Sequence, residues 1–320
     1  MKLPIIKSAI IACGLALGAS SAYAGDALTV VSWGGAYTKS QIEAYHKPYT
    51  AKYGTKIQSE DYNGGLAEIR AQVEAGKITW DVVDLEVSDA ARGCDDGLFE
   101  KISAGSLPNG VNGALPSKDF IPGALQECAV GTIVWSTIYA YDADKYKSKK
   151  PTTISDFFDV KKFPGKRGMR KVPKVNLEWA LMADGVDGKD VYKVLATKAG
   201  QDRAFKKLDT IKNDVLWWEA GAQPPQMLAD GEVVMTSAYN GRIFNAAVTE
   251  KKNFEIVWDR QLFSFDLYAI IKGTPRLKEA LRYVQFSTAS EQLANQARWI
   301  SYGPTRKSSI KLISTHATAG

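Results

Sequence analysis

The sequence predicts an α/β fold of two lobes, each a sheet flanked by helices, with strands that cross between the lobes. Strand-like and helix-like segments alternate within residues 27–87, which is typical of a parallel sheet. Two long β-rich runs, residues 129–141 and 263–271, are each long enough to pass from one lobe to the other. Two such crossings would make both lobes discontinuous in sequence.

The first predicted strand, residues 27–33, is apolar and β-branched, as buried strands are. A helix is expected after it, because Ile42, Tyr45 and Tyr49 recur at helical spacing. Pro48 interrupts the regular pattern of this helix.

The alternation continues with strands at residues 56–62 and 80–87. Between them, Leu66, Ile69 and Val73 form the apolar stripe of an amphipathic helix. Three strands joined by two helices in so short a stretch favour parallel pairing.

The segment between the two long runs predicts the second lobe. Its expected helices lie at residues 154–158, 176–183, 201–211 and 225–229, its expected strands at 232–238 and 254–258, and a further helix at 277–286 follows the second run. We therefore place lobe 1 at residues 25–137 and 268–290, and lobe 2 at 138–267 and 291–320.

The N-terminal residues predict a secretory signal peptide, residues 1–24. Lys2 and Lys7 make a positive start, residues 9–18 are apolar, and Ala22-Tyr23-Ala24 is a small-x-small cleavage site. The apolar stretch is shorter than the roughly 20 residues that span a bilayer. A buried N-terminal helix is the alternative.

Composition narrows the function classes. The net charge of +6 comes from scattered basic residues, so nucleic acid is not an expected partner.

Cys94 and Cys128 are left after cleavage, and an isolated pair in an oxidising compartment predicts a disulfide. His46 and His316 are the two histidines, and no Cys/His group has metal-ligand spacing. We expect no metal, no cofactor and no enzyme activity.

Aromatic and glycine residues follow the first predicted strand. Trp33, Gly34, Gly35 and Tyr37 lie at its carboxyl end, where open α/β sheets bind ligands. The glycines allow close approach to the backbone, and the next helix start offers N–H groups to an anion. The rings would add apolar walls with polar edges. A tight turn beside two core aromatics is the alternative.

Two further polar positions are candidates for the same site. Glu86 follows the third strand, where its carboxylate can accept hydrogen bonds from an ammonium group, and Ser88 lies beside it. Their alternatives are a solvated glutamate and a helix cap. Trp135 and Ser136 break the first long run and would line a cleft, unless the strand only changes faces there.

Asp266 interrupts the apolar second run, where an unpaired carboxylate is costly to bury. It therefore needs a cation or water. Arg242 lies just beyond another strand and can bind a carboxylate through two parallel hydrogen bonds. The alternative is that Arg242 and Asp266 pair with each other.

Together these motifs resemble the periplasmic spermidine/putrescine-binding proteins of ABC importers, within the extracellular solute-binding family 1 that also holds γ-aminobutyrate and opine binders. The resemblance covers most of residues 27–310. It is carried by the signal peptide, Trp33-x-x-x-Tyr37, Tyr239-Asn240-Gly241-Arg242, Asp266 and Trp299-Ile300-Ser301-Tyr302-Gly303-Pro304.

The resemblance implies a type II periplasmic binding protein whose lobes close on an extended amine and which delivers it to a membrane permease. Asp266 would accept the ammonium group. Trp33, Tyr37, Ser88, Tyr239 and Tyr302 would line the site. The ligand would be an amine or a zwitterion, the compartment the periplasm, and the protein a monomer.

Two differences between this chain and the polyamine binders of the family bear on which ligand it binds. Polyamine binders of this group carry an acid within the first aromatic motif, where this chain has Gly34, Gly35 and Ala36. Arg242 would repel a diamine, so a γ-aminobutyrate-type pattern fits better, although Glu86 would restore a second ammonium site. Opine and aminophosphonate binders are further relatives.

Two other functions stay open from the sequence. Glu86 and Asp266 would be the carboxylate pair of a secreted glycoside hydrolase. A binding lobe that serves a chemoreceptor instead of an importer is the other alternative.

Overall fold

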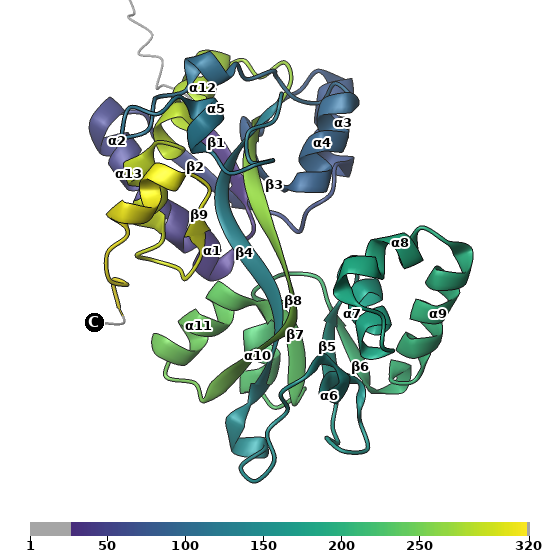
Figure 1. Ribbon diagram of the computed structural model, residues 1–320. Helices are drawn as coiled ribbons and strands as arrows, with labels where there is room; N and C mark the ends of the chain where they lie inside the picture. Colours follow the sequence, from purple (N-terminus) through teal and green to yellow (C-terminus); the bar gives the residue numbers. More distant parts are fainter. Residues whose placement is uncertain (1–26, 319–320) are drawn as a thin grey trace, which may run out of the picture.

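The computed structural model describes residues 27–318 and shows two lobes joined by two long strands (Figure 1). These strands, β4 (Ala129–Asp142) and β8 (Phe254–Ile270), pair antiparallel along their length. They lie at the middle of a sheet ordered β2-β1-β3-β8-β4-β7-β5-β6, with β9 beside β4. The predicted two-lobed α/β fold is confirmed. The predicted signal peptide, residues 1–24, lies outside the described residues.

The first lobe contains the predicted parallel sheet. β1 (Leu28–Ser32) pairs in parallel with β2 (Ile57–Asp61) on one edge and with β3 (Val82–Glu86) on the other. Every residue of β1 and β3 is buried, as expected for strands covered on both faces. The helices of this part are α1 (Gly35–Gln41), α2 (Lys47–Tyr53), α3 (Ala67–Ala75), α4 (Val87–Asp95) and α5 (Pro116–Asp119).

Pro48 is accommodated by a change of helix type. The predicted helix runs as α1, then one turn of π-helix at Ile42–His46, then α2, where Pro48 occupies the first turn. Proline has no N–H to donate and crowds the carbonyl one turn earlier. The regular hydrogen-bond pattern changes just before it, since the N–H of Lys47 bonds to the carbonyl of Ile42 in the π turn.

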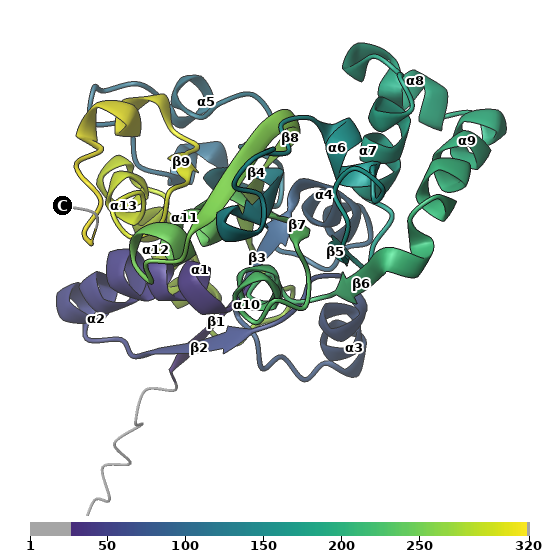
Figure 2. The ribbon, with the colours of Figure 1, turned by 90° about the horizontal axis from the view of Figure 1, so that it is seen from below.

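The second lobe has helices on both faces of its strands (Figure 2). Tyr139 and Tyr141 of β4 face one apolar cluster, while Ile138 and Ala140 face the other, in keeping with the two-residue period of a strand. Its elements are α6 (Ile154–Phe158), β5 (Arg167–Arg170), α7 (Asn176–Ala183), α8 (Val191–Leu195), α9 (Lys198–Asp209), β6 (Val215–Trp218), α10 (Gln223–Ala229), β7 (Met235–Tyr239) and α11 (Asn240–Val248).

The second long run is longer than predicted. The sequence suggested separate strands at 254–258 and 263–271, whereas β8 is one strand of 17 residues. Its central part, around Arg260, is polar and exposed. Because strands are recognised in a sequence by their apolar residues, this part was not predicted as strand. A register shift against β4 occurs beside this part, and such irregularities bend a strand.

The C-terminal elements pack on the first lobe. They are α12 (Leu277–Ser287), α13 (Ser290–Gln296), β9 (Gly303–Pro304) and a 3₁₀ segment at Lys307–Leu312. Tyr45 donates a hydrogen bond to Gln296, and Ile133 of β4 pairs with Pro304 of β9. This packing differs from the predicted boundary, which put residues 291–320 with 138–267. The stretch also contacts the second lobe, since Asn240 of α11 donates to the Ser301 carbonyl and Thr249 forms a hydrogen bond with Thr318.

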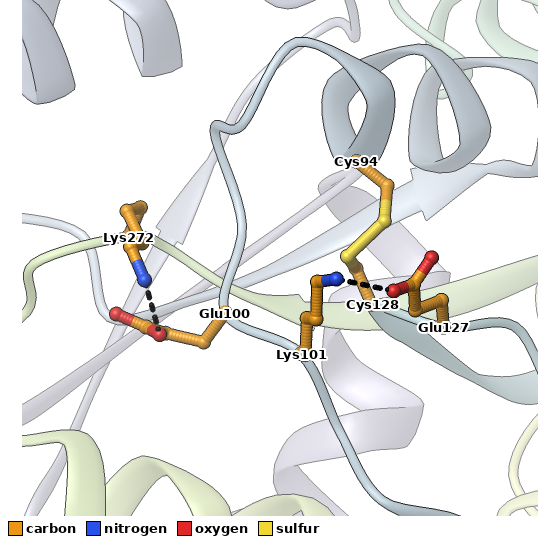
Figure 3. The surroundings of a disulfide bond; sticks show 6 residues. All are labelled: Cys94, Glu100, Lys101, Glu127, Cys128 and Lys272. Carbon is orange, nitrogen blue, oxygen red and sulfur yellow. Dashed lines mark hydrogen bonds and ion pairs between the residues drawn. A yellow bond between two sulfur atoms is a disulfide. The ribbon is translucent and has the colours of Figure 1, made fainter.

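The predicted disulfide joins Cys94 of α4 to Cys128, just before β4, with a Cα–Cα separation of 5.7 Å (Figure 3). An ion pair between Lys101 and Glu127 lies next to it. Among residues 27–318, no helix combines the length and apolar character needed to cross a membrane.

Candidate ligand-binding site

A cavity of about 30 Å³, open to solvent, lies where the strands of both lobes end. Trp33 follows β1, Glu86 ends β3, Arg170 ends β5 and Tyr239 ends β7, so the carboxyl ends of strands from both lobes face one space. This is the position at which open α/β sheets hold ligands. The cavity is lined by Trp33, Tyr37, Asn63, Glu86, Ile133, Trp135, Arg170, Glu219, Gly221, Tyr239, Arg242, Asp266 and Tyr302.

Five aromatic side chains form most of the wall. Tyr37 meets Tyr302 edge to face at 5.8 Å between ring centroids, and Trp135 meets Tyr239 at 4.9 Å. Trp33 packs against the same cluster. These edge-to-face contacts hold the rings at fixed angles, so the cavity has a preformed apolar middle.

Two acids project side by side into the cavity. Glu86 of β3 lies directly opposite Asp266 of β8 in the antiparallel pair, so both side chains share one face of the sheet. Glu86 is neutralised across the lobes, because it accepts from Arg170 Nη1 at 2.7 Å and from Lys174 Nζ. Burial opposes its ionisation, but the charges of Arg170 and Lys174 outweigh burial and lower the pKa of Glu86.

Asp266 has no such partner. It is 5% exposed, and its side chain accepts one hydrogen bond, from Trp135 Nε1 at 2.8 Å. Within residues 27–318 no lysine or arginine forms an ion pair with it. Burial, reinforced by the charges of Asp84 and Glu86, raises its pKa well above the ordinary value. The site therefore holds a buried acid that lacks a cation.

Arg242 reaches from α11 to the turn after β1. Its Nη1 donates to the carbonyl of Gly34 and its Nη2 to that of Trp33, each at 2.9 Å, and its Nε has no partner within the protein. The alternative of an Arg242–Asp266 ion pair does not occur. A Cβ at Gly221 would lie 2.9 Å from this Nε, so glycine is required there for the guanidinium to fit.

The structure places the other predicted residues around the cavity rather than on its wall. The N–H of Gly34 donates to Thr38, and Gly35 packs against the guanidinium of Arg242. Ser88 accepts a hydrogen bond from Lys174, and the Ser136 amide donates to Asn240.

Several lining residues escaped the sequence interpretation. Asn63, Ile133, Arg170, Glu219 and Gly221 were not predicted. Strand β5 lies in a stretch rich in Lys, Pro and Gly that reads as a surface connection, so the position of Arg170 at a strand end carried no clear signal.

Comparison with known proteins agrees with this architecture. The family model for "Bacterial extracellular solute-binding protein" matches residues 44–319. A "Gamma-aminobutyric acid-binding protein" of Pseudomonas aeruginosa is 44% identical over 300 residues, which cover 94% of this chain and 83% of that relative.

Solved structures show the same fold. The PBP MotA from A. tumefaciens B6 in complex with glucopine is 30% identical, with a TM-score of 0.82 over 89% of this chain and 86% of that one. A structure described as a GABA receptor is 31% identical, with a TM-score of 0.76 over 90% and 86%. The expected relationship is confirmed, and these relatives are binding proteins, not enzymes. The chain belongs to the bacterial extracellular solute-binding proteins, which serve ABC transporters.

Proposed function

We propose that the protein captures an ω-amino acid such as γ-aminobutyrate in the cavity between its lobes. Asp266 accepts hydrogen bonds from the ammonium group, and Arg242 donates to the carboxylate. The protein acts in the periplasm after cleavage of residues 1–24 and delivers the ligand, as a monomer, to the permease of an ABC importer.

The observation that carries this proposal is the balance of charges around the cavity. Glu86 is matched by Arg170 and Lys174, and Glu219 by Lys171 at 3.2 Å. This leaves Asp266 as an unmatched acid, and Arg242 as a base bound only to carbonyl oxygens. One acid and one base fit a ligand with one ammonium and one carboxylate.

The aromatic wall suits the methylene chain between those two charges. Tyr37, Trp135 and Tyr302 are each less than a tenth exposed, so they offer a dry apolar surface. Their faces also attract an ammonium group by cation–π contact, which contributes about 0.5–2 kcal/mol. Such a wall favours an extended ligand without further charges.

Contacts between the lobes connect binding with closure. Arg242 and Arg170 each join the second lobe to the first, through Gly34 and Glu86. A ligand held by Asp266 at one end and Arg242 at the other would add to these contacts, and it would therefore favour the closed form.

The relatives support the same ligand class. The 44% identical protein of Pseudomonas aeruginosa is described as binding γ-aminobutyric acid, and one structural neighbour is described as a GABA receptor. A simple polyamine fits less well, because its second ammonium would meet Arg242.

Thermal unfolding of the mature protein against a ligand panel tests the proposal. The panel contains γ-aminobutyrate, 5-aminovalerate, putrescine, spermidine, 2-aminoethylphosphonate and α-amino acids. A ligand at about 100 times its dissociation constant stabilises the folded state by roughly 2.7 kcal/mol, which raises the midpoint by several degrees. A shift with ω-amino acids supports the proposal, and a shift with polyamines alone contradicts it.

A larger zwitterion is the second candidate, and one observation favours it. A second, small hollow of about 20 Å³ shares Glu86, Trp135, Arg170 and Tyr239 with the first and opens beside it. It would take a polar extension on the amine, as in an opine. If an opine produces a larger thermal shift than γ-aminobutyrate, this candidate replaces the first.

A further inference from the structure

We infer that Asp84 and Asp266 form a buried pair of acids that share one proton, and that capture of the ligand's ammonium group releases this proton. In this arrangement Asp84 is a positioning residue, since it does not line the cavity. The inference rests on the proposed function, because it takes Asp266 as the ammonium acceptor.

The β3–β8 pair places the two acids together. Glu86 lies opposite Asp266, and Asp84 lies opposite Tyr268. Asp84 and Asp266 are thus diagonal neighbours on the same face, a relationship that puts Cα atoms about 7–8 Å apart and side chains closer. Asp84 is 0% exposed and Asp266 5%, so water screens little of their repulsion.

Asp84 is also tied to the aromatic wall. It accepts hydrogen bonds from Tyr37 Oη at 2.8 Å, from Gln41 Nε2 at 2.5 Å and from Trp33 Nε1 at 3.4 Å. Asp84 thereby orients two rings that line the cavity. Its charge and its hydrogen bonds both act on the amine end of the site.

Apart from Asp266, the groups that face Asp84 are neutral. They are tyrosine hydroxyls from the surrounding elements, and the hydroxyl of Tyr62 donates to the backbone carbonyl of Asp84. The residues are Tyr37 of α1, Tyr45 of the π-helical turn, Tyr62 after β2, Tyr268 of β8 and Tyr283 of α12.

The charged groups that face Asp266 are already engaged. Glu86 holds Arg170, and Arg242 donates to backbone carbonyls. The other neighbours are neutral tyrosine hydroxyls, those of Tyr37, Tyr62, Tyr239 and Tyr302. Within residues 27–318, no lysine or arginine forms an ion pair with Asp84 or Asp266, so the pair lacks compensation until a cation enters.

Two buried acids without a cation do not both ionise near neutral pH. Burial raises the pKa of Asp84 to about 7, against hydrogen bonds from Tyr37, Gln41 and Trp33 that lower it. The pKa of Asp266 is raised as well. An ammonium group beside Asp266 favours its carboxylate form, and the proton leaves for the solvent without any change of covalent bonds in the ligand. Ligand affinity therefore rises as pH increases toward the range where both acids ionise.

Isothermal titration calorimetry with γ-aminobutyrate tests this. Titrations at about pH 6–7 in buffers of different ionisation enthalpy yield the number of protons released on binding. The ligand's own carboxyl and amino groups do not titrate in this range. Burial lowers the pKa of His46 to about 4, so this histidine is no source of protons either. For the wild type we expect the release of between about half a proton and one proton per ligand, falling as pH rises and both acids ionise in the free protein.

The variant Asp84→Asn removes the neighbouring charge and keeps the shape of the side chain. Burial still raises the pKa of Asp266 in this variant, but the added repulsion from Asp84 is gone and the pKa falls. At a given pH, proton release should therefore be smaller than in the wild type, and affinity should vary less with pH. Glu60→Gln is the matched control, because Glu60 also accepts an indole N–H, from Trp80 at 2.8 Å, but does not line the cavity. It should release as many protons as the wild type.

Wild-type binding without proton release in this range overturns the inference and leaves the proposed function intact. Equal release by wild type and Asp84→Asn overturns the role of Asp84. If the variant fails to fold, the wild-type proton count alone decides. No binding of γ-aminobutyrate by the wild type overturns the proposed function, and this inference with it.

Discussion

Arg242 donates a hydrogen bond to the carbonyl oxygen of Gly34 at 2.9 Å and so joins α11 of the second lobe to the turn after β1. The same guanidinium lines the cavity and keeps an unpartnered Nε. In our proposal, one side chain therefore both recognises the carboxylate and holds the lobes together. The carboxylate of the ligand would be recognised by Arg242 only when the lobes are closed.

Replacing Arg242 should separate the ligand classes. In Arg242→Gln we expect γ-aminobutyrate to bind about 100-fold or more weakly, since a buried charged partner is lost. Putrescine should bind as well as before or better, because a repulsive charge is removed. Calorimetry with both ligands measures this, and the exposed Arg298→Gln is the control. Equal losses for both ligands would contradict a role in carboxylate recognition.

Replacing Asp266 should affect every amine. Asp266→Asn keeps the size of the side chain but removes the charge that accepts the ammonium group, so we expect a loss of about 100-fold or more. Stability of the unliganded protein should not fall, because the buried charge is costly without a ligand. Calorimetry and thermal unfolding measure the two effects. Retained affinity would refute the assigned role.

Glu86 tests whether an acid in the cavity contacts the ligand or only joins the lobes. If it acts through Arg170 and Lys174, Glu86→Gln should weaken closure and lower the affinity for γ-aminobutyrate and putrescine by the same factor. A selective loss of putrescine would mean that Glu86 is a second ammonium site. Stopped-flow measurement of ligand dissociation should show faster release of both ligands in the first case.

The disulfide should stabilise the fold without affecting the ligand. Cys94 and Cys128 are 34 residues apart, and closing a loop of this length adds about 3–4 kcal/mol. Urea unfolding of the Cys94→Ala, Cys128→Ala double variant should show a loss of this order. Its affinity should be unchanged because neither residue lines the cavity. A large loss of affinity would show that the bond shapes the site.

Asp84 should make the stability of the unliganded protein depend on pH. Its pKa is raised from 3.8 to about 7 on folding, so the folded state disfavours the carboxylate. This cost is absent below about pH 4, grows as pH rises through that interval and is complete above about pH 7. Relative to the wild type, Asp84→Asn should therefore gain stability between pH 5 and pH 8 in urea unfolding. A constant difference would contradict this assignment.

Local patterns predicted much of the secondary structure. The strands near residues 27–33 and 80–87 were found because most of their residues are apolar. The strand near residues 56–62 has few apolar residues, but the Asn63-Gly64-Gly65 turn marks its end. Helix α11 was missed, since the Tyr239–Arg242 stretch that begins it contains Asn240 and Gly241, which favour turns.

The position of the C-terminal residues was hard to predict for a different reason. Nothing local to residues 290–312 indicates which lobe they join. Their position depends on contacts with residues far away in the sequence, such as Gln296 with Tyr45 and Arg306 with Asp119. Packing of this kind is decided by the whole fold.

The sequence by itself determined the α/β class, the crossing strands, the disulfide and the prominence of Asp266 and Arg242, because apolar periodicity and a charge within an apolar run are local signals. Only the tertiary structure decided which charges are matched. Glu86 meets Arg170 and Lys174, 84 and 88 residues away, while Asp84 lies beside Asp266 through the pairing of β3 with β8. Such contacts form between lobes and across strands, and Coulomb interactions depend on distance in space rather than on separation along the chain.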